Sequence, residues 1–476
     1  MSLYYGVSMN TSIHPSPEKW RTHDVWAISL SAFFADLGYQ GVLAGLPLFM
    51  VITLHASVAL YGLAMALGFG GGSLIAYLGS RFGDRIGHRK LAIIGNSAIP
   101  LLSLTALIAS PIAAITFFCA GWWARNLRSP SRRVMLTKST TESSRTQAFG
   151  FLHALDIGGG IFAGIYMIIS VAEGLGYRYV FLGTIIPLVI STFCLTITDR
   201  GLDRRPDRRP DNRSDGKEHG ALPANEDVPN SSATSPAAGQ SATPAATPAA
   251  SPASNPAATP AAGQSAAPAA GSANKAAGSP AGKPVLPRNA MLAILAATIL
   301  FGFSSYSVGF PILTAARGAH NSALGLVAFL VFNAVSAATG MSLSGHLGST
   351  WHERFRNLGM LGYLPAAAGA ALLGISAALK LPYPVILLSI AILGLSLGIV
   401  ETLEPSIMSV IRPVGGSGFG LLSAYRSAGL FAGNLVMGLL YTLGAAWSYG
   451  YAAIVALAGA SILLLTMRSR EWPRSR

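Results

Sequence analysis

Six ionisable side chains lie within long apolar stretches of this chain, and their chemistry needs an explanation first. They are Asp36, Arg125, Asp156, Glu401, Glu404 and Arg426. A charged group at membrane depth costs a few kcal/mol unless it is paired or hydrated, so these residues are candidates for a proton or substrate pathway. The alternative is that they form static ion pairs that only hold helices together.

A second group of charges lies between two apolar segments, in residues 79–90. It consists of one carboxylate and four cations: Asp84, Arg81, Arg85, Arg89 and Lys90. We expect a short loop in which Gly83 and Gly87 allow tight turns. Short loops rich in Lys and Arg stay on the cytoplasmic side of a membrane, so an ordinary positive-inside loop is the simplest interpretation.

The composition is that of a membrane protein. Hydrophobic residues make up 51% of the chain, charged residues only 11%, and the mean hydropathy is +0.49. Soluble domains carry about 25% charged residues. The net charge of +14 could indicate nucleic-acid binding. The cations lie in short loops and at the C-terminus, however, so membrane orientation explains them and no nucleic-acid partner is expected.

Several kinds of chemistry find no support in the sequence. Cys119 and Cys194 both lie in apolar segments and offer neither a disulfide framework nor metal-ligand spacing. The glycines at 68 and 70–72 follow no strand, so they indicate close helix packing rather than a phosphate loop. No nucleotide-binding loop or hydrolase constellation is found. We therefore expect no enzyme, no cofactor, no metal and no ATP drive.

The hydropathy pattern predicts twelve membrane-spanning helices, each long enough to cross about 30 Å of hydrocarbon. They are expected near 25–50, 57–79, 91–110, 112–131, 147–171, 177–197, 289–313, 321–346, 357–379, 382–404, 416–443 and 446–467. The predicted domains are a tail at 1–24, a six-helix bundle at 25–198, a linker at 199–288, a second bundle at 289–467 and a basic tail at 468–476.

The linker and the loop charges fix the expected orientation. Residues 221–284 are almost entirely Ala, Pro, Ser, Gly and Thr, which cannot bury a core, so we expect a passive tether. Regulation or partner binding by this segment is the alternative. Lys and Arg gather in the loops on the linker side and in the C-terminal tail. Both termini and the linker are therefore predicted to be cytoplasmic, in a multi-pass protein of the cytoplasmic membrane.

The two halves of the chain repeat each other with inverted charges. Residues 149–156 align with 419–426 without a gap, which places Asp156 opposite Arg426. Arg125 and Arg128, followed by Pro130, correspond to Glu401 and Glu404, followed by Pro405.

These features together resemble the Major Facilitator Superfamily. The resemblance rests on the motif G-x-x-x-D-R-x-G-R-R/K between helices 2 and 3, which is matched by Asp84, Arg85, Gly87, Arg89 and Lys90. Arg89 comes one place late, Ser80 stands where Gly is usual, and the counterpart at 345–354 lacks the Asp-Arg core. The resemblance implies an all-α membrane fold of twelve transmembrane helices in two pseudo-symmetric six-helix bundles.

The resemblance also implies roles for the candidate residues. Helices 1, 4, 7 and 10 line the central cavity of the family, so Asp36, Arg125, Glu401 and Glu404 are expected in the aqueous path. Asp156 and Arg426 are further proton-coupling or cavity candidates. The family's antiporters often carry an Arg on helix 4 that modulates a carboxylate, and Arg125 corresponds to it in outline. The loop around Asp84 is expected to act as a conformational latch.

Together these inferences predict a secondary active transporter that moves a small solute by alternating access. Protons are the expected coupling ion, efflux is favoured over import, and the protein is expected to be a monomer in the lipid bilayer. The charged stripes on helices 4 and 10, Arg125 with Arg128 and Glu401 with Glu404, are predicted to meet as a cytoplasmic gate between the halves. The competing possibility is that Arg125 pairs with Asp36, which leaves only Arg128 for Glu404. The alternative from another class is a non-transporting membrane sensor or scaffold that keeps the fold.

Overall fold

The computed structural model describes residues 21–141, 144–203, 288–304, 307–343, 347–348, 350–411 and 417–468. Within these ranges every regular element is a helix, which confirms the all-α prediction. Eight helical segments of the described residues are long and apolar enough to cross a membrane. The count of twelve crossings stays a prediction.

The described helices fall into two groups, one from each half of the chain. The first half contains α1 (His23–Leu48), η1 (Phe49–Thr53), α2 (Val58–Ile86), α3 (His88–Ala98), η2 (Ile99–Ala106), α4 (Pro111–Lys138), α5 (Arg145–Ala172), α6 (Tyr177–Gly183), α7 (Ile185–Thr196) and η3 (Arg200–Asp203). The second contains α8 (Arg288–Ser304), α9 (Gly309–Ala319), α10 (Ser322–Leu343), α11 (Trp351–Asn357), η4 (Leu358–Tyr363), α12 (Leu364–Ala378), α13 (Tyr383–Ile411), α14 (Ser417–Leu443) and α15 (Ala445–Arg468).

Local sequence explains where the first two long helices begin. The hydroxyl of Thr22 accepts the backbone N–H of Val25 at 3.3 Å, and that of Ser57 accepts the N–H of Leu60 at 3.2 Å. These side-chain caps satisfy donors that the first helical turn leaves without a partner. Beyond the caps, the apolar runs give each helix a surface that packs against its neighbours.

The segment at 79–90 differs from the loop that the sequence predicts. Residues 79–86 continue α2, α3 begins at His88, and Gly87 alone makes the turn, with φ 101°. Gly83 is helical and buried. It packs so closely against His88 that a Cβ there would lie 2.5 Å from Nδ1 of that residue, so this position needs a glycine. Two adjacent helix ends with a one-residue joint hold the charged side chains more rigidly than a loop would.

The segment predicted as one helix at 289–313 also differs, because it forms two elements. α8 ends at Ser304 and α9 begins at Gly309. The backbone N–H of Ser307, between them, is bound by the side-chain oxygen of Asn434 on α14 at 2.9 Å. The interruption therefore gains a partner from the neighbouring helix instead of an intrahelical bond.

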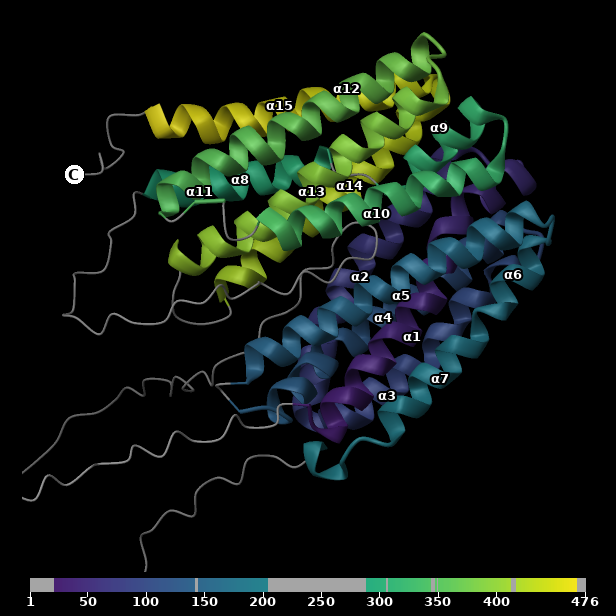
Figure 1. The fold of residues 1–476 in the computed structure, drawn as a ribbon, viewed down its shortest axis with the longest axis vertical. Helices are drawn as coiled ribbons and strands as arrows, with labels where there is room; N and C mark the ends of the chain where they lie inside the picture. Colours follow the sequence, from purple (N-terminus) through teal and green to yellow (C-terminus); the bar gives the residue numbers. More distant parts are fainter. Residues whose placement is uncertain are drawn as a thin grey trace, which may run out of the picture.

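Two helical bundles lie side by side, with α1–α7 in one and α8–α15 in the other (Figure 1). The main packing between them joins α2 to α14 and α5 to α10. Gly62 and Gly438 allow the backbones of α2 and α14 to approach closely, since a Cβ on Gly62 would lie 2.8 Å from the Cα of Gly438. Small residues at such a crossing let two helix backbones touch.

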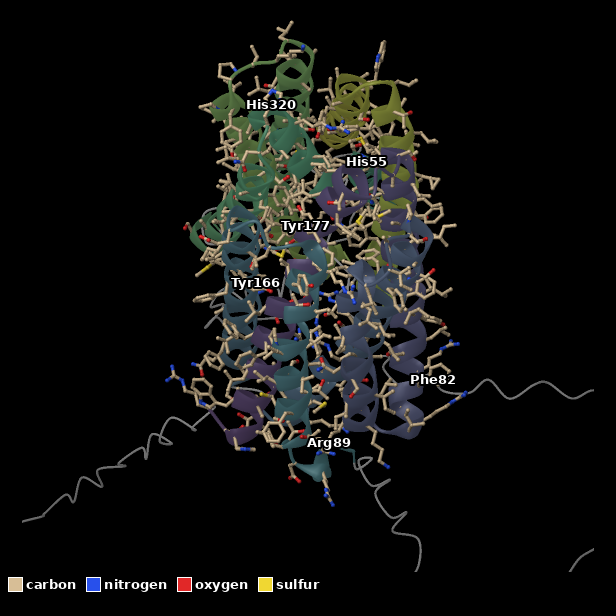
Figure 2. The ribbon with its side chains drawn as sticks, turned by 90° about the vertical axis from the view of Figure 1, so that its right-hand side faces the viewer. His55, Phe82, Arg89, Tyr166, Tyr177 and His320 are labelled. Carbon is tan, nitrogen blue, oxygen red and sulfur yellow. The ribbon has the colours of Figure 1, made fainter. Side chains whose placement is uncertain are left out.

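The two ends of the molecule differ in how the halves meet. We call the end that carries Gly87 and Asp199 the linker end, and the opposite end the His55 end. Figure 2 shows His55 and His320 towards one end of the view and Phe82 and Arg89 towards the other.

Several contacts between the halves lie in the part of the bundle nearer the His55 end. The hydroxyl of Tyr61 lies 2.8 Å from that of Ser307, and α1 and α2 both pack against Gly309 of α9. Further along α2, the hydroxyl of Ser73 lies 2.6 Å from that of Ser427 on α14. This is a conformation closed at the His55 end.

Parts of the predicted domain plan lie outside the described residues. These are residues 1–20 of the first tail, 204–287 of the linker and 469–476 of the last tail. The counterpart of the charged turn at 345–354 is described only in part, and there Arg354 donates to the carbonyl of Gly348 at 3.0 Å and to Ser406 at 2.6 Å.

Candidate functional site

The first candidate site is a pair of carboxyl groups, Asp36 of α1 and Asp156 of α5. Both are buried, with exposed fractions of 1% and 4%. The helices meet closely because Gly159 has no side chain, and a Cβ there would lie 3.0 Å from that of Asp36. The carboxyl group of Asp156, one turn before Gly159 on the same helix, therefore lies near that of Asp36, and the two act on each other electrostatically. Two ionised carboxylates held close together in a buried place repel each other strongly.

Guanidinium groups of α4 surround this pair. Arg132 donates to Oδ2 of Asp156 at 3.2 Å, and the charges of Arg132 and Arg125 both act on Asp36. Arg125 donates to the hydroxyl of Tyr39 at 3.2 Å and lies over the rings of Tyr39 and Trp122, at 5.1 and 5.2 Å from their centroids. Aromatic faces stabilise a desolvated cation, so Arg125 remains close to Asp36 without pairing with it.

Arg128 is the most deeply buried cation of α4, with no exposed surface. It donates to Oδ1 of Asn96 on α3 at 2.6 Å. The amide nitrogen of Asn96 in turn donates to Ser191 and Thr192 of α7, at 3.1 and 2.8 Å. This polar chain ties α4, α3 and α7 together inside the first bundle.

The second bundle holds a matching cluster of opposite sign. Glu404 on α13 accepts hydrogen bonds from Arg426 on α14 and from the hydroxyl of Tyr363, the latter at 2.6 Å. Glu401 lies 3.9 Å from the other terminal nitrogen of Arg426. The guanidinium lies 5.8 Å from the ring centroid of Phe301. One cation is therefore shared by two carboxylates.

The clusters correspond in their helices but not residue for residue, because the sequence repeat sets Arg128, not Arg132, opposite Glu404. In the first half, Asp156 of α5 pairs with Arg132 of α4. In the second half, Arg426 of α14 pairs with Glu404 of α13. The corresponding helices are thus joined by an ion pair in each bundle, with the signs exchanged.

The predicted cytoplasmic gate is not formed in this conformation. Arg128 is bound to Asn96 and Glu404 to Tyr363 and Arg426, so each is held within its own half. The six ionisable candidates have exposed fractions of 0–7%. Their place in an aqueous path, and the gate itself, stay predictions.

Among the described residues no ion pair joins Asp36 to Arg125, which was the competing possibility for these side chains. Arg125 is bound to Tyr39 instead. The structure also brings together no three His, Cys, Asp or Glu side chains that could hold a metal ion, within the part of the chain that it describes.

The predicted latch residues lie at the linker end of the first bundle. Asp84, whose side chain is 64% exposed, lies 3.3 Å from Nε2 of His88, whose other ring nitrogen is 3.3 Å from the hydroxyl of Ser131. Arg85 and Lys90 are exposed, on either side of Gly87. Their role as a latch stays a prediction.

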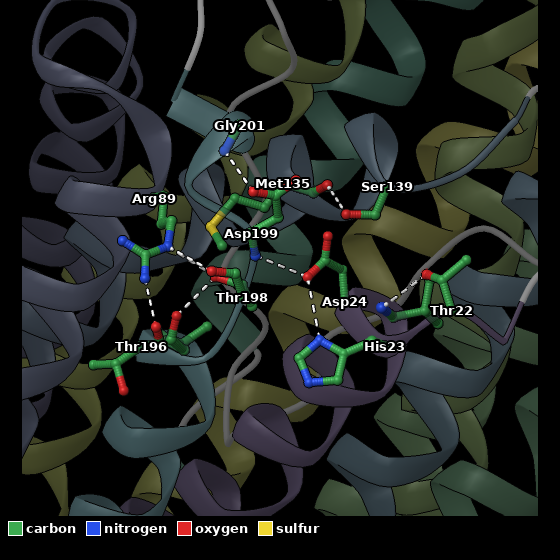
Figure 3. A network of polar contacts seen from close by, with 12 residues as sticks. Thr22, His23, Asp24, Arg89, Met135, Ser139, Thr196, Thr198, Asp199 and Gly201 are labelled. Atoms are coloured by element: carbon green, nitrogen blue, oxygen red, sulfur yellow. Dashed lines mark hydrogen bonds and ion pairs between the residues drawn. The ribbon is translucent and has the colours of Figure 1, made fainter.

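Arg89 has a clear structural role in this conformation. It donates to the carbonyl and hydroxyl oxygens of Thr198, both at 3.1 Å, and to the carbonyl of Thr196 at 2.5 Å (Figure 3). It therefore caps the C-terminus of α7, where carbonyl groups lack intrahelical partners. Nearby, Asp24 of α1 accepts the N–H of Asp199 at 2.9 Å. These contacts brace the linker end of the first bundle.

Sequence reasoning missed several partners that complete the clusters: Tyr39, Asn96, Arg132 and Tyr363. One signal was available, because Arg125, Arg128 and Arg132 follow the three- and four-residue spacing of one helix face. No sequence pattern separates Tyr39, Tyr363 and Asn96 from other polar residues in apolar helices.

The comparisons agree with this architecture. The family model described as Major Facilitator Superfamily matches residues 28–414. No curated protein matches the chain in the sequence comparison.

The chain is also similar to solved transporter structures. One is the nucleoside transporter NupG, with a TM-score of 0.63 and 11% identity, covering 94% of this chain and 100% of the other. A second is a bacterial homolog of the human lysosomal transporter Spinster, at 0.62 and 12%, covering 96% and 100%. A third is a bacterial homologue of the human peptide transporters PepT1 and PepT2, at 0.61 and 14%, covering 94% and 98%.

At such identities the structural likeness shows the fold alone, whereas the family model spans most of the chain. The two paired helical bundles (Figure 1) have the organisation that this fold implies. The chain therefore belongs to the Major Facilitator Superfamily.

Proposed function

We propose that this chain is a secondary active transporter that couples the movement of a small solute to protons by alternating access, with export as the direction. The linker end, where Lys and Arg gather, is the cytoplasmic side. The conformation closed at the His55 end is then the inward-facing state of the cycle.

The observation that carries the proposal is the close approach of two buried carboxyl groups, Asp36 and Asp156, where α1 meets α5 at Gly159. Two buried carboxyl groups so near each other repel strongly when both are ionised, so we place one shared proton on the pair. A proton held between two helices is well suited to coupling, because its loss changes the force between those helices.

Loss of the proton is expected to separate α1 from α5 at this point. Asp156 keeps Arg132, 3.2 Å away, as its partner. Asp36 is repelled by Asp156 and attracted by the guanidinium of Arg125, whose charge already acts on it. The change in partner moves or rotates α1, which carries Asp36.

The same helix reaches the contacts that close the His55 end. Pro47 of α1 packs at the site of Gly309 on α9, where the hydroxyl of Tyr61 also lies. From Asp36 to Pro47 is eleven residues, or about 16 Å along a helix. A displacement of α1 at Asp36 can therefore loosen the closed end, which links protonation to alternating access.

The proposed cytoplasmic gate completes the cycle at the linker end. In an outward-facing state Arg128 and Glu404 would approach across the interface and exchange their present partners. Buried ion pairs gain attraction but lose hydration, so the net free energy can be near zero. A near-balanced pair suits a protein that must open again. The end of α2 that carries Asp84, with the turn at Gly87, would act as the latch of that state.

Transport by the purified full chain in proteoliposomes tests the function. A panel of labelled solutes that includes nucleosides and short peptides is assayed with and without an imposed pH gradient. Wild-type protein should move at least one solute, and the gradient should accelerate it. The sign of the flux reads the direction. Asp36→Asn should retain solute binding but lose the acceleration.

Asp24→Asn is the matched control, since Asp24 lies on the same helix but at the linker end, bonded to Asp199. Its pH-driven flux should equal that of the wild type. Unchanged acceleration in Asp36→Asn would rule out this coupling site. No flux of any solute by well-inserted protein would favour the sensor or scaffold alternative.

A further inference from the structure

A cavity of about 300 Å³ lies at the His55 end of the second bundle, away from the charged clusters. It is formed by α9, α12, α13 and α14 together with the first residue of α15. Its lining includes three basic side chains, Arg317, His320 and Lys380, and no acidic one. All three are exposed, so they form a rim that a solute can reach from the aqueous side.

The position of these cations is unusual for the chain. At the His55 end the loops and helix ends carry only Arg178, Arg317 and Lys380 as Lys or Arg residues. Two of the three converge on this one cavity. Lys and Arg are scarce on the side opposite the cytoplasm, so their gathering there needs a reason beyond membrane orientation.

Ion pairing does not supply that reason. Among the described residues, the ion pairs involve neither Arg317 nor Lys380. Arg317 lies 5.5 Å from the ring centroid of Tyr441. The guanidinium therefore lies beside a neutral aromatic partner, and no ion pair within the described residues compensates its charge.

The floor of the cavity is polar and rigid. Thr314 and Tyr441 are 5% and 4% exposed, and their hydroxyl groups lie 2.7 Å apart. The Thr314 hydroxyl is also 2.6 Å from that of Tyr449. These bonds fix the floor, and a fixed set of hydroxyl groups under a cationic rim is a suitable arrangement for an oxyanion.

The helix ends at the cavity do not decide its charge. α9, α12 and α14 end there and present carbonyl groups, whereas α13 and α15 begin there and present N–H groups. These helix ends carry partial charges of opposite sign that cancel in part, whereas Arg317 and Lys380 each carry a full positive charge. His320 and Lys380 both have a left-handed backbone, with φ 51°, so the chain holds each at a tight helix end.

We propose that this cavity binds a phosphate-type anion, either a free anion or the headgroup of an anionic lipid. The site is separate from the proposed transport path and lies on the face opposite the linker. Occupancy would hold α9 to α12, and α9 is the helix on which the closed His55 end rests.

Binding measurements on the purified full chain test this. The first probe is inorganic phosphate in detergent, by calorimetry and by the shift of the unfolding midpoint. The second probe is phosphatidylglycerol, in nanodiscs of phosphatidylcholine with and without it. The variant is the double substitution Arg317→Gln and Lys380→Gln, and both side chains are exposed, so the fold should tolerate it. Arg178→Gln is the matched control at the same end.

At least one probe should bind wild type and Arg178→Gln equally and bind the double variant about tenfold more weakly, which corresponds to about 1.4 kcal/mol. A response to phosphate identifies a free-anion site, and a response to phosphatidylglycerol alone identifies a headgroup site. Binding by neither probe, or the same loss in the control, overturns the proposal and leaves the cations as complements of helix C-termini.

Discussion

The hydroxyl groups of Tyr61 and Ser307 lie 2.8 Å apart, although 246 residues separate them in the chain. This hydrogen bond joins α2 to the segment before α9, and so joins the two halves at the closed end. Both side chains are buried, at 0% and 1% exposure. A bond of this kind exists only while the His55 end is closed. Removing it should therefore shift the equilibrium between the closed and open conformations of that end.

Tyr61→Phe should shift that equilibrium towards opening of the His55 end. The lost hydrogen bond is worth about 1 kcal/mol, so the population ratio should change about fivefold. Spin labels on His55→Cys and His320→Cys, one exposed site in each half, report the separation by pulsed electron resonance after Cys119 and Cys194 are replaced. Tyr166→Phe is the control, because Tyr166 bonds to Val180 within one half at 2.8 Å. Equal distance distributions in both variants would contradict the assignment.

Gly62→Ala should act on the same equilibrium more strongly. The added methyl would lie 2.8 Å from the Cα of Gly438 and 2.6 Å from the carbonyl oxygen of Asn434, and backbone atoms cannot move aside cheaply. The same label pair should show the His55 end mostly open. At Gly150 an added Cβ meets nothing within 4 Å, so Gly150→Ala should leave the distribution unchanged. A closed end in Gly62→Ala would show that this glycine contact is not required.

Asp84→Ala tests the latch. We expect the inward-facing population to rise, because the end of α2 that carries Asp84 is proposed to bind the other half only when the linker end is closed. Labels on Phe82→Cys and Arg356→Cys, which are exposed and lie in different halves, read the distance at that end. Asp24→Ala, which removes a carboxylate at the same end of the first bundle, should not change it. The latch role is wrong if both variants behave like the wild type.

The positions of the helices were predictable, whereas their partners were not. Apolar runs of about 20 residues mark a membrane helix regardless of what it touches, and the α2, α5 and α14 regions were placed within a few residues, except that α2 extends to Ile86. That extension was missed because charged residues at a helix end look like a loop in hydropathy. The break between α8 and α9 was missed because Asn434, which binds Ser307, is remote in sequence.

The candidate site was predicted as a set of residues but not as a set of contacts. The inverted repeat singled out Asp156 and Arg426, and each forms an ion pair within its own bundle, with Arg132 and Glu404. Which neighbouring helix faces each residue depends on tertiary packing. Asp36 was considered with Arg125 on helix 4, yet Gly159 brings it against Asp156 on α5, and spacing within one helix carries no information on that approach.

A double-mutant cycle of Arg128→Gln and Glu404→Gln tests the proposed gate. If these side chains meet in the outward-facing state, each single variant should lower its population and the double variant should lower it less than the sum. Mutations of two residues in contact show coupling energies of about 0.5–3 kcal/mol, whereas the effects of mutations at distant sites simply add. The Phe82 and Arg356 label pair measures the populations. Additive effects would mean that each residue acts only within its own bundle, through Asn96 or Arg426.

The shared proton between Asp36 and Asp156 is the central claim, and infrared difference spectroscopy during a pH change tests it without any solute. A protonated carboxyl group has a carbonyl band that an ionised one lacks. The account predicts one such band that titrates in wild type, disappears in both Asp36→Asn and Asp156→Asn, and remains in Glu401→Gln, which removes a buried carboxyl from the other half. A band that persists unchanged in both aspartate variants would contradict the account.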